Sequence, residues 1–194
     1  MDEFDDLDLI EDVESLEANG ESGHEGYPAT AVLVEEHRFI KKAIDTLVNA
    51  VKNGIEDEKF YLNLAEFFSE YADAIHHGKE EEILFEYLKK NAPEHVLEIV
   101  SELENDHVRG RELVKKIREN ASSVNALRNY ALAYASMLRD HIFKEDEGLF
   151  SAMHPYLPKE KEKEMMEEFM KADPPAKRDL EMLVEELAKR GQAE

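Results

Sequence analysis

The sequence predicts an all-α protein whose central part is an up-down-up-down four-helix bundle. Apolar residues recur at intervals of three and four through four long segments between residues 29 and 154, which is the spacing of amphipathic helices. The sustained apolar–polar alternation that marks a half-buried strand is absent from the sequence. Because the connections between the four segments are short, sequential helices are expected to run antiparallel and to form a bundle.

Turn-forming residues bound the first two helices. The first helix is expected over residues 30–53, where Gly54 ends it. A short acidic link then leads to a second helix over residues 57–90. The second helix is therefore the longest of the four.

The third and fourth helices have recognisable starts. Asn91 is predicted to cap a third helix over residues 93–120, because a proline in the first turn suits a helix start. Ser122 or Ser123 is predicted to cap the fourth helix. The prolines that follow Met153 end that helix, since proline cannot continue it.

Two flanking segments lie outside the predicted bundle. Residues 1–28 hold eleven acidic residues and no Lys or Arg, which predicts a solvated acidic tail, with a docking strip for a basic partner or a metal-gathering arm as alternatives. Residues 155–194 form a C-terminal extension with two further helical patterns, 159–171 and 176–190. Their apolar residues are expected to pack either on the bundle or on a partner.

Composition narrows the classes of function. The 194 residues carry a net charge of −22, so phosphate backbones repel the chain and nucleic acid is not expected as a partner. The absence of cysteine excludes disulfides, thiolate catalysis and cysteine-ligated metals. No apolar run approaches the ~18–20 residues of a membrane span. The acidic N-terminus is the reverse of a signal peptide, so a cytoplasmic location is expected.

Each predicted helix carries one histidine on its core-facing stripe, and two helices add a glutamate one turn later. These residues are His37, His76, Glu80, His107, His141 and Glu145. Measured from the predicted helix ends at ~1.5 Å per residue, the four histidines lie at the same depth to within about 7 Å. A buried glutamate is costly unless it is paired or ligates a metal. The pattern therefore predicts a metal site inside the bundle.

The donor types limit the metal and its number. Imidazole and carboxylate without sulfur suit iron, manganese or zinc. Two glutamates on facing helices are well placed to bridge two ions, which favours a dinuclear site. With two histidines, two shared carboxylates and one bridging oxygen, each ion has five ligands, and an octahedral ion keeps one position open for a small molecule.

Four segments carry a resemblance to a known family. They are residues 35–38 (EEHR), 76–85 (HHGKEEEILF), 105–111 (NDHVRGR) and 141–150 (HIFKEDEGLF). Together they resemble the hemerythrin-like (HHE cation-binding) family of non-haem di-iron bundles, over about residues 30–153. The resemblance implies two iron ions, oxo- or hydroxo-bridged, and a dioxygen, nitric oxide or peroxide ligand.

The resemblance also implies a ligand assignment. His37 and His76 are expected on one iron, His107 and His141 on the other, and Glu80 and Glu145 as bridges. Two points stay open: His77 with Glu81 has the same spacing as His76 with Glu80, and Asp146 can replace Glu145. Oxygen-carrying hemerythrins have a fifth histidine one turn from the third-helix histidine. Leu103 and Arg111 hold those positions here, a departure that weighs against classical oxygen transport.

Three functions compete at this point. The first is a di-iron protein that binds a small molecule or that senses or holds iron. The second, an iron-oxidising ferritin-like enzyme, needs two Glu-x-x-His motifs, but only Glu104 with His107 matches, which leaves Glu104 open as an extra ligand. The third is a metal-free helical adaptor that binds a partner through its acidic tail and C-terminal helices.

Overall fold

The computed structural model describes residues 27–191, and its first two long segments lie side by side. The first helix is α2 (Pro28–Lys52). The second segment is continuous but changes character along its length: α3 (Glu58–Phe67), the π-helical η1 (Phe68–His77) and η2 (Glu80–Leu84), then α4 (Phe85–Asn91). The predicted acidic tail falls almost entirely outside the described residues.

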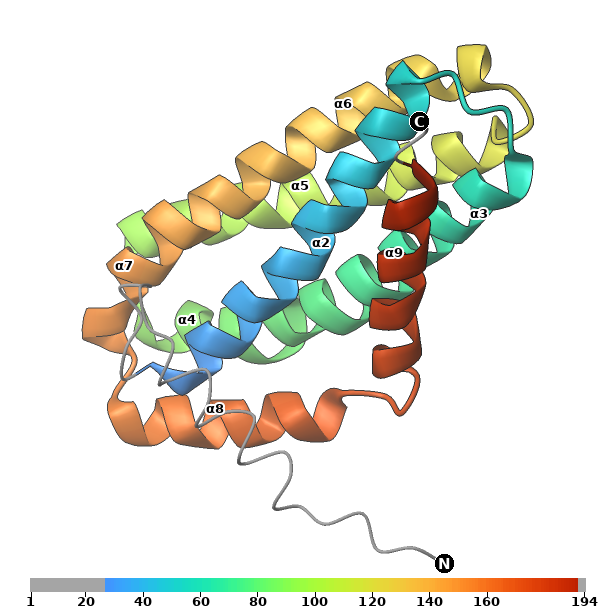
Figure 1. Ribbon diagram of the computed structural model, residues 1–194. Coiled ribbons are helices and arrows are strands. Elements are labelled where there is room, and N and C mark those ends of the chain that lie inside the picture. The colour runs from blue at the N-terminus through green and yellow to red at the C-terminus, as the bar shows by residue number, and fades with distance from the viewer. Residues whose placement is uncertain (1–26, 192–194) are drawn as a thin grey trace, which may run out of the picture.

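The third and fourth segments complete the bundle. They are α5 (Glu94–Glu119), then α6 (Val124–Phe143) with the π-helical η3 (Lys144–Leu149) and the short α7 (Phe150–Met153). Figure 1 shows the long segments α2, α3–α4, α5 and α6–α7 running along one another. The described residues contain no strand, as predicted, and none of their helices combines the length and apolar character needed to cross a bilayer.

Local chemistry explains most of the helix ends. The Asp57 carboxylate accepts a hydrogen bond from the Phe60 backbone N–H, and the Ser123 hydroxyl accepts one from Ala126 N–H. Gly54 has a φ of +67°, a left-handed conformation that glycine adopts without steric cost. The prediction for Asn91 is wrong: it is the last residue of α4, and its amide donates to the Tyr87 carbonyl instead of capping α5.

The C-terminal extension continues through the short 3-10 helix η4 (His154–Tyr156) and packs on the bundle. The helix α8 (Lys159–Ala172) crosses one end of the bundle, and α9 (Lys177–Gly191) lies along α2 and α3 (Figure 1). Phe169 and Leu187 on these two helices are buried in the two apolar clusters of the core. The apolar faces that the sequence offered to the bundle or to a partner therefore cover the bundle.

A buried carboxylate joins the extension to the first helix. Glu162 on α8 accepts hydrogen bonds from the Ala29 backbone N–H at 2.9 Å and from the Thr30 hydroxyl at 3.1 Å. The residue that precedes α2 makes no side-chain cap, so Glu162 satisfies a donor at the start of a helix 132 residues earlier. Helix α8 thereby fixes where α2 begins.

Candidate metal centre

The six residues that the sequence predicts as ligands lie in one layer of the bundle interior. Each is at most 1% exposed: His37 on α2, His76 on η1, Glu80 on η2, His107 on α5, His141 on α6 and Glu145 on η3. Apolar clusters lie on both sides of this layer, one reaching Ile40 and Ile142 and the other Leu33 and Leu149. The two clusters shield the layer from solvent along the bundle axis.

The histidines meet in two pairs, and a carboxylate lies between the pairs on each side. The Nε2 atoms of His37 and His76, the first pair, are 3.0 Å apart, and those of His107 and His141, the second pair, are 3.2 Å apart. One Glu80 carboxylate oxygen lies 3.5 Å from His76 Nε2, and the other lies 3.4 Å from His107 Nε2. The Glu145 oxygens lie 3.1 Å and 3.0 Å from nitrogens of the first and second pairs.

The donors of this layer fit metal ions. No carboxylate oxygen of Glu80 or Glu145 has a hydrogen-bond partner among the described residues, although both side chains are fully buried. Such burial is costly unless a cation compensates it. Two donors about 2.1 Å from one ion and at a right angle to each other lie about 3 Å apart, which is the spacing within each histidine pair.

A seventh donor, His77, also faces this layer. Its side chain is 5% exposed, its ring stacks on His107 with centroids 3.8 Å apart, and neither ring nitrogen has a hydrogen-bond partner in the described part of the chain. The Nδ1 atom of His77 lies 3.5 Å from an oxygen of Asp73. Because η1 is π-helical, its turns differ from those of an α-helix, and neighbouring residues His76 and His77 both reach the core.

The seven donors form two groups, each of which can hold one ion. The first is His37, His76, Glu80 and Glu145, and the second is His77, Glu80, His107 and His141. The sequence treated His76 and His77 as alternatives, whereas the structure brings both inward. His77 supplies a fifth imidazole that the third helix lacks, since Leu103 is an apolar core residue and Arg111 lies at the surface.

A second ring of carboxylates surrounds the histidine pairs. Each histidine turns Nδ1 toward one of them: His37 toward Asp146 at 2.8 Å, His76 toward Glu36 at 2.9 Å, His107 toward Glu81 at 2.7 Å and His141 toward Asp106 at 3.7 Å. This leaves Nε2 of every ring directed at the centre. A carboxylate at the outer nitrogen fixes the orientation of a metal-binding imidazole and raises its basicity.

The ring of carboxylates settles where the remaining candidate ligands lie. The sequence offered Glu81 and Asp146 as alternative ligands. In the structure their carboxylates contact the outer Nδ1 atoms of His107 and His37 and do not enter the inner layer. Glu104, the residue left from the ferritin-like reading, forms an ion pair with Lys89 at 2.8 Å on the surface. The inner layer is therefore supplied by five histidines and two glutamates.

The two halves of the bundle, α2 to α4 and α5 to α7, carry the same arrangement of carboxylates and cations around their histidines. Carboxylates and the cations that support them correspond in pairs: Glu36 with Asp106, Glu81 with Asp146, Lys41 with Arg111, and Lys79 with Lys144. Each residue of a pair has the same sequence offset from a ligand histidine or glutamate in its half. The repeat breaks at His77, because the residue after His141 is Ile142.

The C-terminal extension contributes a cation to the carboxylate that contacts His76. Lys177 at the start of α9 donates to Glu36 at 2.7 Å and to Asp173 at 2.7 Å. Lys79, whose side chain is buried, forms ion pairs with Glu36 and Asp173. The carboxylate that orients His76 is thus held by cations from both the bundle and the extension.

Neighbouring carboxylates shift the pKa values of two histidines in this centre. Burial lowers the pKa of His37, but Asp146 and Glu145 outweigh burial and raise it to about 9. Burial is likewise outweighed at His141, where Glu145 and Asp106 raise the pKa to about 10. Burial would raise the pKa of Glu145, yet His141 and His37 hold it well below its usual range. Metal binding must displace these imidazole protons.

Comparison with known proteins gives one match. A family model described as the hemerythrin HHE cation-binding domain matches residues 29–153. No curated protein and no solved structure matched the chain. The matched range covers all seven donors of the inner layer and stops before α8 and α9.

Proposed function

The chain belongs to the hemerythrin HHE cation-binding family, and we propose that its inner layer holds two iron ions and binds dioxygen, nitric oxide or peroxide there. The observation that carries the proposal is the set of four buried carboxylate oxygens that lie between two histidine pairs and have no hydrogen bond among the described residues. Iron supplies the coordination and redox chemistry that protein side chains lack. The protein supplies the donors, their orientation and the exclusion of water.

The five imidazoles make the two ions unequal. His77, His107 and His141 serve one ion, whereas only His37 and His76 serve the other. An ion beside His107 and His141 would therefore have three imidazole donors, and an ion beside His37 and His76 would have two. A small molecule would find more room at the ion with two imidazoles. The sequence weighed against oxygen binding because a histidine was missing from the third helix, and His77 removes that objection.

Anaerobic ferrous loading tests the metal assignment. We expect two iron ions per chain in the unaltered protein and in the surface control His95→Ala, because His95 lies outside the donor layer. The double variant His76→Ala/His141→Ala loses one histidine from each pair and should lose stoichiometric iron and the thermal stability that iron adds. If the unaltered protein retains no iron after loading and its circular dichroism spectrum is still helical, the proposal is overturned in favour of the metal-free adaptor.

Exposure of the loaded protein to air then separates the ligands. A visible absorption band that appears with oxygen and disappears on its removal indicates reversible gas binding. Irreversible oxidation together with turnover of added peroxide indicates peroxide removal. If neither of these changes occurs, small-molecule binding is contradicted. Iron sensing or storage at the same donors would then explain the site.

A further inference from the structure

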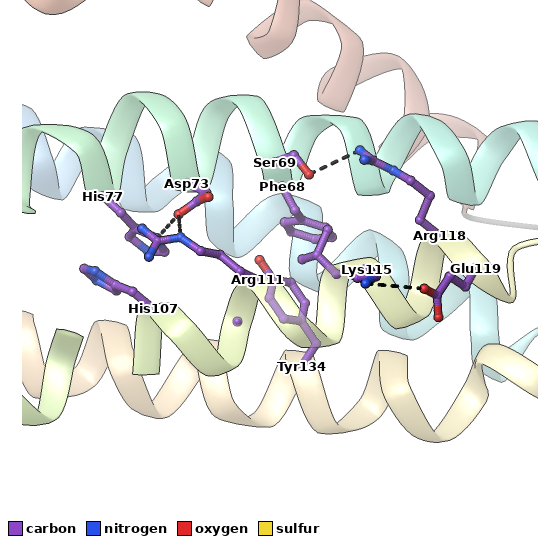
Figure 2. A pocket seen from close by; sticks show the side chains of 12 residues that line it. Phe68, Ser69, Asp73, His77, His107, Arg111, Lys115, Arg118, Glu119 and Tyr134 are labelled. Carbon is purple, nitrogen blue, oxygen red and sulfur yellow. Dashed lines mark hydrogen bonds and ion pairs between the residues drawn. The ribbon is translucent and has the colours of Figure 1, made fainter. Parts of the chain in front are cut away.

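A cavity of about 460 Å³ opens between η1 and α5 and reaches the metal centre. Figure 2 shows His77 and His107 at one end, Phe68 and Tyr134 along its middle, and Arg118 at the other end. At ~1.5 Å per residue, the distance along α5 from His107 to Arg118 is about 16 Å. The cavity is therefore an elongated passage from the surface to the centre.

A glycine keeps this passage open. Gly110 is buried on the cavity side of α5, and a Cβ atom there would meet the Met137 Cε at 3.3 Å and a Tyr134 ring carbon at 3.7 Å. A larger side chain at this position would occupy the space beside Tyr134. The middle of the cavity is otherwise apolar, lined by Phe68 and Val114.

The cavity is too large for the ligands of the iron centre alone. A water molecule takes up about 30 Å³ of liquid, and a diatomic gas or peroxide is of similar size. The volume here exceeds that by an order of magnitude and lies in the range of pockets for organic ligands, about 300–1,000 Å³. The passage thus has room for an organic molecule.

The outer end of the cavity offers cations with spare capacity. The Arg118 guanidinium donates to the Ala65 carbonyl at 3.4 Å and to the Ser69 hydroxyl at 3.2 Å, and within residues 27–191 no carboxylate lies in ion-pair distance of it. The Lys115 ammonium is 3.9 Å from Glu119, a carboxylate that Lys116 also holds at 2.8 Å. Glu119 also lines this end, so Arg118 and Lys115 leave one positive charge in excess there, which favours an anion over a ferrous ion.

The inner end presents a buried imidazole that makes no hydrogen bond among the described residues. His77 lines the cavity, is 5% exposed, and has no hydrogen bond at either ring nitrogen among the described residues. Arg111, which also lines the cavity, differs from Arg118 because Asp73 at 2.7 Å and Glu81 at 2.6 Å already neutralise it. A ligand in the passage therefore meets a cation at the surface and an imidazole beside the metal.

We propose that this cavity binds an organic anion, a carboxylate with an extended apolar body. Its carboxylate lies on Arg118 and Lys115, its body lies along Val114 and Tyr134, and its far end is directed toward His77. The placement of that end beside iron rests on the proposed function, whereas binding itself needs no metal.

Isothermal titration calorimetry with octanoate tests the proposal on both metal-free and iron-loaded protein. We expect one octanoate per chain, and no comparable binding of the neutral alcohol 1-octanol. Loss of both exposed cations in Arg118→Gln/Lys115→Gln should weaken octanoate binding at least tenfold. Gly110→Leu should abolish it by filling the passage.

The matched control is Arg109→Gln/Lys163→Gln, which removes the same charge from exposed positions outside the cavity. Equal weakening in both double variants, or no binding to the unaltered protein, would overturn the proposal. Iron content is measured on the same samples. Normal iron without octanoate binding refutes the cavity proposal alone, whereas octanoate binding without iron refutes the di-iron proposal alone.

Discussion

If iron occupies the centre as proposed, its removal should reverse the pH dependence of stability. In the metal-free protein the pKa of His37 is raised from 6.5 to about 9 and that of His141 from 6.5 to about 10. A basic group whose pKa rises on folding stabilises the protein fully below its unfolded pKa, and that stabilisation is lost as pH rises through the folded pKa. The metal-free protein should therefore lose stability from about pH 6.5 to about pH 9–10.

The size of the loss follows from the size of the shift. One pKa unit corresponds to 1.36 kcal/mol, so the His37 shift represents about 3 kcal/mol. Both rings are at most 1% exposed, so solvent screening removes little of this. His37 and His141 share Glu145, so their contributions overlap and do not add fully. Burial lowers the pKa of His77, so this residue changes the free energy of unfolding only below about pH 6.5.

Iron changes the sign because it binds neutral imidazoles. At pH 7 the protons of His37 and His141 must leave, so the apparent iron affinity should rise about tenfold per pH unit for each proton released. Urea unfolding followed by circular dichroism, with a chelator or with anaerobic ferrous salt, measures both stabilities from about pH 6.5 to about pH 9. Metal-free stability that rises with pH, or equal slopes for the two forms, would refute this reasoning.

Substitutions at three positions test other parts of the structure. Glu162→Ala should lower the free energy of unfolding by about 2 kcal/mol in urea titrations, because the start of α2 loses its acceptor; Glu162→Gln should cost less, since burial already raises the pKa of this carboxyl and a neutral amide can still accept a hydrogen bond. Lys177→Met should weaken iron binding about tenfold in a chelator competition, because Glu36 loses a cation and holds His76 less firmly, and an unchanged affinity would contradict that coupling. His77→Ile copies Ile142 of the other half; two iron ions should remain, and their Mössbauer spectra should become more alike than in the unaltered protein.

The helices could be predicted because their ends carry local signals. Gly54, Asp57 and Ser123 act within one turn of where they stand, and sequence reading found all three. The prediction that Asn91 caps the third helix was wrong because asparagine is common both at the end of one helix and before the start of the next. The π-helical turns of η1, η2 and η3 leave no such signal, since a change from i→i+4 to i→i+5 hydrogen bonds keeps the residues and alters only their pairing.

Six of the seven inner donors could be predicted from depth, but His77 and the supporting residues could not. Stripes of three and four residues place the histidines at one level whatever the details of packing. The contact of Lys177 with Glu36 joins residues 141 positions apart, and no periodic pattern reaches that far. The outer carboxylates had a simpler signal: each stands next to a predicted ligand in the sequence, as Glu36 does beside His37. Acidic residues are so frequent here that this adjacency did not stand out.

One position decides whether the two metal ions are equivalent. The repeat of carboxylates and cations gives both halves of the bundle the same supports, so by itself it would produce two equal ions. His77 departs from its counterpart Ile142, and the π-helical η1 turns it inward. The organic cavity opens on the same side, with His77 in its wall. If two ions bind as proposed, His77 therefore gives one of them a third imidazole, and it stands between the centre and any molecule that enters the passage.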